Sequence, residues 1–354
     1  MKKTTYLLLV ITIVLGMLLA GCGALAGCGS QENNEGAAGS TESSTQASAQ
    51  ADTQPVTIDH RYASKEEGAK LLLGNEEYYD GFSRNDLAYR TQSQTGTMEE
   101  YKAFAKEQVL DFTEEQKEYL NQHLENIAQR MTEKGYQIPK TDQIVFISTT
   151  MKEECDVLAY THGTQIYLDG ATIDSYIGDS EKDQKIEYVL AHELFHCLTR
   201  CNPVFRADMY QLIHFTVQDE DFQIPPSVEE YFISNPDVEH HNAYATFEIN
   251  GKKTDCFMAF ITTKHFEKEG DRFFDSAAAA LVPIDGTDTY YLPEDGSNFD
   301  EVLGKNTDYV VDPEECMADN FGFLVAYDKD GPEGKGYPNP EIIEGIRSYL
   351  QQEK

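Results

Sequence analysis

The sequence predicts an α+β fold, and three observations support this prediction. Apolar residues recur at spacings of three and four in several stretches, which is typical of helices. Short runs rich in β-branched and aromatic residues lie elsewhere, as expected of strands. The two kinds of segment do not alternate regularly, so a doubly wound parallel sheet is not expected. With 354 residues, 40% of them hydrophobic, the chain can bury a large core, which excludes a wholly disordered protein.

The first elements of the folded part are predicted to be helices. Ser64–Glu67, Thr97–Glu100 and Thr113–Gln116 each begin with Ser or Thr and place Glu or Gln three residues later, the capping-box pattern of a helix start. The third helix has an apolar stripe at helical spacing, formed by Leu120, Leu124, Ile127, Ala128 and Met131. We therefore expect residues 57–141 to form an N-terminal helical segment.

Strands and helices are mixed in the remainder of the chain. In order, we expect strands at 143–149 and 164–168, a helix at about 181–200, strand-like runs at 244–249, 255–262 and 277–283, and a final helix at about 340–350. Before the final helix, Asp312-Pro313 predicts another helix start, with Asp as the N-cap and Pro at the first helical position.

The first 28 residues have the pattern of an export signal. Two lysines precede an apolar run from Tyr6 to Ala20, and about 15 residues of helix span only ~22 Å, less than the ~30 Å core of a bilayer. Leu19-Ala-Gly-Cys22 resembles a bacterial lipobox, and Leu25-Ala-Gly-Cys28 repeats the pattern. We therefore expect lipidation at Cys22, or alternatively at Cys28, and an anchor on the extracytoplasmic side of a bacterial cell membrane.

Residues 29–56 are predicted to form a disordered tether between this anchor and the folded part. Residues 29–55 contain no aromatic residue, no large aliphatic residue and no Lys or Arg. Such a segment cannot bury enough apolar surface to offset the entropy lost on ordering.

The chain is strongly acidic, with 28 Lys and Arg against 62 Asp and Glu and a formal net charge of −34. Loss of two lysines with the signal lowers the charge to −36, and the four acids of the tether leave −32 on the part from Val56 onward. Nucleic acid is excluded as a partner because phosphate binding requires clustered Lys and Arg.

A metal-binding pattern lies within the helix predicted at 181–200, where the chain reads His192-Glu193-Leu-Phe-His196. Two His at i and i+4 share one face of a helix about 6 Å apart, so both imidazoles can reach one Zn²⁺. Glu193 can take a proton from a zinc-bound water, whose pKa zinc lowers toward ~7. The pattern predicts a zinc-dependent hydrolase, and two ordinary structural histidines are the alternative.

A catalytic zinc also needs a third protein ligand and an open position. Thr199 and Asn202 stand where the metzincin pattern requires Gly and His, which excludes that branch. Further along, Glu315 and Asp319 stand at i and i+4. Here the chain resembles the gluzincins, thermolysin-like zinc peptidases whose signature is HEXXH followed by E-x-x-x-D. The resemblance implies a zincin-like catalytic domain over 142–354, with Glu315 as third ligand and Asp319 fixing the tautomer of a ligand His.

Two alternatives to Glu315 as the ligand remain open. Asp312-x-x-Glu315 also fits a capping box, in which Glu315 would only close the helix start. Glu314 could be the ligand instead, although its i+4 residue is Ala318. The strand predicted at 163–168 precedes the motif, as does the edge strand that holds the substrate backbone in zinc peptidases.

The interval between the motif and Glu315 is long for a gluzincin, because 119 positions separate His196 from Glu315. We therefore expect an insertion over about 202–310. It contains His240, His241 and Tyr244, the candidates for stabilising the negatively charged oxygen that forms during hydrolysis.

Together these patterns predict a lipid-anchored, monomeric zinc metallopeptidase that acts on a peptide or protein substrate. The alternative is a non-catalytic surface binding or scaffold lipoprotein whose metal is structural or absent. Glu193 distinguishes the two hypotheses, because a structural metal site has no use for this carboxylate.

Overall fold

A computed structural model describes residues 54–352 of the chain. The predicted signal, nearly all of the predicted tether and both candidate lipidation sites, Cys22 and Cys28, lie outside the described residues. No helix within 54–352 combines the length and the hydropathy needed to cross a bilayer.

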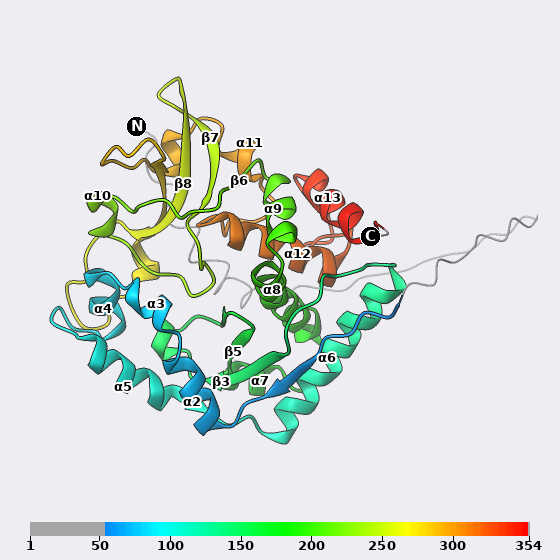
Figure 1. The fold of residues 1–354 in the computed structure, drawn as a ribbon. Helices are drawn as coiled ribbons and strands as arrows, with labels where there is room; N and C mark the ends of the chain where they lie inside the picture. The colour runs from blue at the N-terminus through cyan, green and yellow to red at the C-terminus, as the bar shows by residue number, and fades with distance from the viewer. Residues whose placement is uncertain (1–53, 353–354) are drawn as a thin grey trace, which may run out of the picture.

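The first of two β-sheets has five strands and lies in the lower half of Figure 1. Four strands follow the order β1 (His60–Tyr62), β3 (Ile144–Thr149), β5 (Gln165–Asp169) and β4 (Ala159–His162), and β2 (Val109–Leu110) also pairs with β3. β1, β3 and β5 run parallel, whereas β2 and β4 are antiparallel to their neighbours. The sheet is therefore mixed, and its edge at β4 is antiparallel.

The second sheet is antiparallel throughout and lies in the upper half of Figure 1. Its order is β6 (Thr216–Val217), β7 (Ala243–Ile249), β8 (Lys252–Thr262) and β9 (Ala277–Pro283). Asn250 and Gly251 both have positive φ and join β7 to β8, as a two-residue hairpin turn that follows the strand twist requires. The whole sheet falls within the region predicted as an insertion, 202–310.

The N-terminal helices begin at the predicted capping residues. They are α2 (Lys65–Leu73), α3 (Glu76–Asp80), α4 (Arg84–Arg90), α5 (Met98–Gln108) and α6 (Glu114–Glu133). Ser64, Thr97 and Thr113 accept hydrogen bonds from backbone N–H groups three residues later, although only the last two form complete capping boxes. The same segment contributes β1 and β2 to the first sheet, so the boundary predicted near residue 142 runs through a shared sheet.

Two long helices occupy the centre of the molecule, between the two sheets (Figure 1). α8 (Asp183–Cys201) carries the metal-binding pattern, and α12 (Pro313–Tyr327) begins at the predicted Asp312 cap. They pack closely because Gly322 lacks a side chain: a Cβ there would lie 3.0 Å from the Tyr188 ring and 3.2 Å from its carbonyl oxygen. This contact determines how closely α12 approaches α8.

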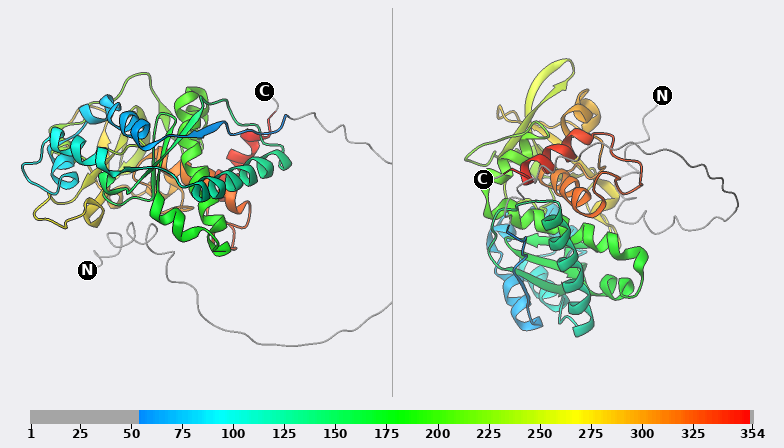
Figure 2. Two further views of the ribbon diagram at one scale, coloured as in Figure 1. Left: turned by 90° about the horizontal axis from the view of Figure 1, so that it is seen from below. Right: turned by 90° about the vertical axis from the view of Figure 1, so that its right-hand side faces the viewer.

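The remaining helices cover the outside. They are α7 (Gly170–Tyr176), α9 (Pro203–Gln211), α10 (Pro226–Glu229), α11 (Phe299–Leu303) and α13 (Pro340–Leu350). In Figure 2, the N-terminal segment with the first sheet and the segment with the second sheet lie on opposite sides of the molecule. The observed mixture of helices and strands agrees with the predicted α+β class.

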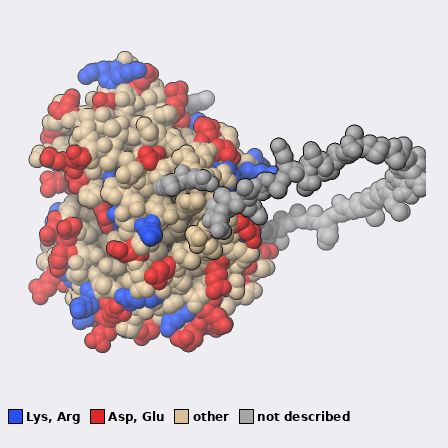
Figure 3. Space-filling view, turned by 45° about the vertical axis from the view of Figure 1, so that its right-hand side comes forward, with Lys and Arg blue, Asp and Glu red and all other residues tan. Residues whose placement is uncertain are grey.

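Charged side chains divide between the surface and a few buried clusters. On the face in Figure 3, acidic side chains are widely spread and Lys and Arg are sparse, as the composition leads one to expect. Arg90, in contrast, is buried, where it pairs with Asp86 at 2.6 Å and with Glu154 at 2.6 Å. Its guanidinium also donates to the carbonyl oxygen of Ser234 at 2.8 Å, so it ties α4 to a distant loop.

Glu153, a buried glutamate next to Glu154, has one carboxylate oxygen without a hydrogen bond within the described residues. Glu153 accepts a hydrogen bond from the Tyr160 hydroxyl at 2.9 Å. Its other carboxylate oxygen is buried and has no hydrogen-bond partner among residues 54–352. Burial raises the pKa of Glu153 to about 7, because the charged form loses its hydration.

This carboxylate predicts a pH-dependent stability. Because its folded-state pKa of about 7 exceeds the ordinary value of 4.5, the stability that the protonated form contributes is lost as pH rises through 7. A Glu153→Gln variant cannot ionise there, so its free energy of unfolding relative to the wild type should increase by about 2.5 kcal/mol between pH 5 and pH 8. Urea denaturation at the two pH values measures this, and an equal difference at both would contradict it.

Candidate metal centre

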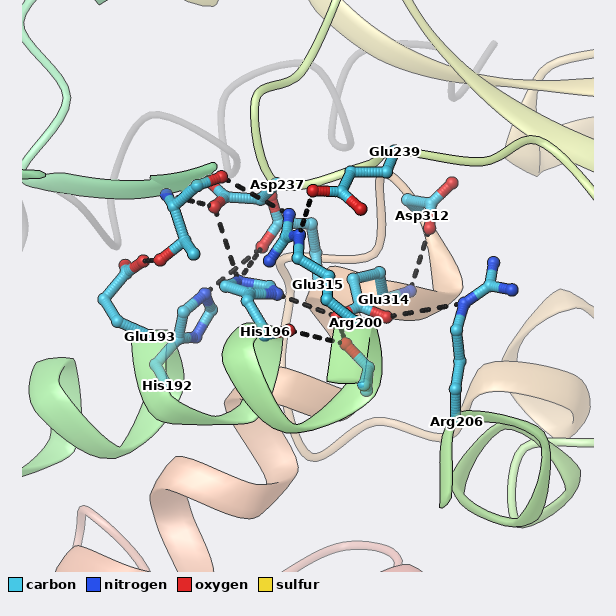
Figure 4. A network of polar contacts seen from close by, with 12 residues as sticks. His192, Glu193, His196, Arg200, Arg206, Asp237, Glu239, Asp312, Glu314 and Glu315 are labelled. Carbon is cyan, nitrogen blue, oxygen red and sulfur yellow. Dashed lines mark hydrogen bonds and ion pairs between the residues drawn. The ribbon is translucent and has the colours of Figure 1, made fainter. Parts of the chain in front are cut away.

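The residues of the HEXXH pattern lie on the buried face of α8. His192 is 8% exposed, Glu193 3% and His196 0%. One helical turn separates the two histidines, so their ring centroids lie 4.9 Å apart. Both rings turn the same edge toward the first turn of α12 (Figure 4).

Glu315 reaches both histidines from α12. Its Oε2 atom lies 3.2 Å from His192 Nε2 and 3.6 Å from His196 Nε2. One potential ligand atom of each of the three residues lies within 4.8 Å of the other two. The structure thus brings together the three residues that the sequence predicts as ligands.

The chemistry of this trio fits zinc. Tetrahedral ligands about 2.0–2.2 Å from a zinc ion are roughly 3.3 Å from one another, close to the observed separations. His196 Nε2 is buried and has no hydrogen-bond partner within the described residues, although a buried imidazole nitrogen normally has one. Two imidazoles and one carboxylate are also a ligand set that catalytic zinc sites use.

Asp319 orients His192, as the sequence predicts. Its Oδ1 atom lies 2.9 Å from His192 Nδ1, and the carboxylate also accepts hydrogen bonds from the hydroxyl groups of Tyr188 and Thr307. These contacts favour a proton on Nδ1, which leaves Nε2 free to bind a metal.

Glu314 does for His196 what Asp319 does for His192, and sequence reasoning missed this role. Glu314 Oε1 lies 2.9 Å from His196 Nδ1, and the carboxylate accepts from the Thr199 hydroxyl at 2.6 Å and the Tyr210 hydroxyl at 2.5 Å. It therefore faces the side of His196 away from Glu315. Consecutive residues on a helix point about 100° apart, which was the available signal that Glu314 and Glu315 differ in function.

The capping-box interpretation of Glu315 does not hold. Asp312 caps α12 without Glu315, by accepting a hydrogen bond from Glu314 N at 2.8 Å. The Glu315 carboxylate instead accepts from the Asn235 side chain at 2.5 Å and from the Tyr309 hydroxyl at 3.1 Å, besides its contact with His192.

Glu193 lies beside the trio but is held separately. Its Oε2 atom accepts a hydrogen bond from the Thr161 hydroxyl on β4 at 2.7 Å. Thr161 also donates its backbone N–H to Asp237 Oδ1 at 2.6 Å, and a second close group consists of Glu193, His196 and Asp237. Two carboxylates therefore flank the metal trio on the side of β4.

The strand expected to border the site is not at the sheet edge. Residues 165–169 form β5, which lies between β3 and β4. Gly163 has φ of 56° and, with Thr164, turns the chain so that β4 folds back along β5, with His162 opposite Gln165. The strand at this edge is therefore β4, which begins at Ala159, four residues before the strand predicted at 163–168.

The predicted oxyanion candidates lie away from the trio. His240 is exposed and pairs with Asp221 at 3.2 Å, His241 packs against the Phe232 ring, and Tyr244 lies in β7. All three residues lie in β7 of the second sheet or directly before it, and the contacts of the two histidines are with residues of that region. Tyr309 does place a hydroxyl at the site, because it reaches Glu315 and its ring lies 6.5 Å from the His192 ring.

A cleft opens beside the trio. His192, Glu193 and Glu315 form part of its wall, together with Asp237 and Tyr309. Its apolar wall comes from Val157, Leu158, Ala159, Tyr188, Phe260, Phe273 and Phe274. An elongated molecule with apolar groups can therefore reach the trio along β4.

Buried negative charge dominates the electrostatics of the site. Burial raises the pKa of Asp237, and the nearby carboxylates of Glu193 and Glu315 raise it further. Burial acts in the same direction on Glu315, but its interactions with His192 and His196 lower its pKa to about 2. A cation bound here would stabilise the ionised forms of these carboxylates.

Comparisons of the chain with protein-family models, with curated proteins and with solved structures each gave no match.

The contact between Glu314 and His196 leads to a test of metal affinity. Glu314→Gln removes the negative charge that holds His196 Nδ1–H, so zinc affinity should fall 10- to 100-fold. Competition with a chromogenic chelator measures the dissociation constant. Glu301→Gln, on the exposed side of α11, is the matched control and should bind zinc as the wild type does. Equal affinity in both variants would show that Glu314 does not support the site.

Proposed function

We propose that the protein is a zinc-dependent peptidase with a zincin-like catalytic domain of the gluzincin type. The observation that carries this proposal is the convergence of His192, His196 and Glu315 at 3.2 to 3.6 Å beside a cleft that Glu193 lines. The edge strand β4 lies beside the helix that carries HEXXH and lines the cleft at Ala159, so an extended substrate can lie along the start of this strand.

In this proposal His192, His196 and Glu315 hold the zinc. A bound zinc lowers the pKa of a water molecule toward ~7 and polarises the substrate carbonyl. Asp319 and Glu314 keep the two imidazoles in the orientation that presents Nε2.

Glu193 acts as the proton carrier. Its carboxylate takes a proton from the attacking water and then delivers it to the nitrogen of the leaving amine. The hydrogen bond from Thr161 holds Oε2 at 2.7 Å and so fixes the carboxylate beside the substrate. The Tyr309 hydroxyl, 3.1 Å from Glu315 Oε1, is the donor best placed to stabilise the carbonyl oxygen as it becomes negative.

We place the enzyme at the extracytoplasmic surface of a bacterial membrane. The two lipobox-like sequences ending at Cys22 and Cys28 support a lipid anchor, and residues 29–56 would hold a monomeric folded part away from the bilayer. Peptides or proteins at the cell surface would be the substrates.

Replacement of Glu193 by Gln tests the function directly. Purified wild-type protein should contain about one zinc and hydrolyse members of a peptide library, detected by mass spectrometry. Glu193→Gln should keep the zinc, since it is not one of the proposed ligands, and lose at least about 100-fold in rate, because the proton carrier is gone. Glu181→Gln, exposed just before α8, is the control and should retain full activity.

Two results would contradict the proposal. Undiminished hydrolysis by Glu193→Gln would exclude this mechanism. A wild-type protein without zinc and without hydrolysis of any peptide would favour the alternative of a non-catalytic binding or scaffold lipoprotein.

A further inference from the structure

One segment of the region 202–310 crosses the site beside β4, and we name residues 234–239 the strap. Asp237 Oδ1 accepts a hydrogen bond from Thr161 N at 2.6 Å, and Glu239 Oε1 accepts from Gly163 N at 2.9 Å. The strap therefore occupies backbone donors at the outer edge of β4, where an added peptide strand would otherwise pair. Figure 4 shows Asp237 and Glu239 facing α8 from this segment.

The strap is firmly held. The Arg200 guanidinium on α8 pairs with Glu239 at 2.7 Å and donates to the carbonyl oxygen of Pro236 at 3.2 Å. Asn235 donates to Glu315 at 2.5 Å, and the buried Arg90 donates to the carbonyl oxygen of Ser234 at 2.8 Å. Charge-assisted hydrogen bonds from buried arginines are among the stronger polar contacts in proteins, so the strap is a fixed wall.

This wall ends the cleft on one side. Asp237 lines the cleft beside the trio, and it also lines a second cavity bordered by Arg200, Val238 and Glu239. The strap thus separates the two spaces. On its other side the cleft continues past Val157 and Ala159, so a peptide lying along β4 can extend from the trio in one direction only.

The closed end is suited to a positive group. The Asp237 side chain is 9% exposed, and its Oδ2 atom has no hydrogen bond within the described residues. Arg200 nearby is already paired with Glu239. A carboxylate at this end attracts an ammonium group and repels the carboxylate of a peptide C-terminus.

The spacing also fits an amino terminus. Asp237 Oδ1 lies 3.8 Å from His196 Nε2, so little length remains between the metal ligands and the wall. An α-ammonium nitrogen is two bonds from the carbonyl carbon of its own residue, roughly 2.5 Å away, whereas one more residue would need about 3.3–3.6 Å of extended chain. The distance leaves no space for a further residue between the metal ligands and Asp237, so a group that meets Asp237 belongs to the residue under attack.

We propose that Asp237 binds the free α-ammonium group of a peptide, and that the strap makes the enzyme an exopeptidase that removes residues singly from the amino terminus. This inference rests on the proposed function. In each turnover one water is consumed: its oxygen joins the carbonyl carbon, the C–N bond breaks, and the electron pair stays on nitrogen. Both water protons finish on that nitrogen, so a free amino acid and a shortened peptide leave.

The test compares one peptide in three forms: with a free amino terminus, with the terminus acetylated, and with the carboxyl terminus amidated. The full-length wild-type protein should release the first amino acid from the free and amidated forms at similar kcat/KM. Acetylation removes the positive charge, so it should lower kcat/KM at least about 100-fold. Amino-acid release and product masses provide the readout.

Asp237→Asn should bind as much zinc as the wild type and lose about 100-fold in kcat/KM on the free peptide. Its kcat/KM should no longer differ more than a few-fold between the free and acetylated forms. Asp221→Asn, an exposed carboxylate of the same region, is the control and should behave as the wild type does. If Asp237→Asn does not fold, the three peptide forms with the wild-type protein still decide the question.

Three results would overturn the inference. Internal cleavage of the acetylated peptide as fast as the free one, abolished by Glu193→Gln, would reject it and leave the proposed function intact. Higher activity or lower zinc content in Asp237→Asn would identify Asp237 as a metal ligand that closes the site. Failure of the wild-type protein to hydrolyse any form would reject the inference together with the proposed function.

Discussion

The packing of α8 against α12 determines how His192, His196 and Glu315 meet. Gly322 lets the backbone and ring of Tyr188 approach α12 closely, and the ring centroids of Phe195 on α8 and Phe321 on α12 lie 5.6 Å apart. At this separation, Glu315 faces both histidines and Asp319, one turn later, reaches the back of His192. A wider gap would leave short side chains such as Asp319 out of reach.

The same packing gathers negative charge that burial disfavours. Glu314, Glu315 and Asp237 are all buried, and Glu193 lies among them. The folded chain offsets part of this cost with two partly buried arginines, since Arg200 pairs with Glu239 and Arg206 lies 4.0 Å from Glu314. The rest of the cost would be offset by the histidines and by a cation bound between them, so the negative charge of the site suits a positive group.

Local patterns predicted the elements well, whereas the contacts between distant elements could not be predicted. HEXXH and E-x-x-x-D report on single helices, and the structure brings them together as expected. Periodicity cannot tell which of two adjacent strands lies at a sheet edge, because that depends on the turn at Gly163. Asp237 and Tyr309 follow no spacing rule, since the strap and the loop before α12 reach the site only through tertiary packing.

The 119 positions between His196 and Glu315 have a consequence for chain entropy. A metal bound by both residues closes a loop of that length, and the entropic cost of closing a loop grows only with the logarithm of its length. Lengthening it from about 30 residues to about 120 adds roughly 1 kcal/mol, which is small beside the about 10–16 kcal/mol that structural zinc can contribute. A second sheet can therefore be carried between two ligands at little thermodynamic cost. The segment that shapes the cleft can thus change in length and sequence while the metal centre stays in place.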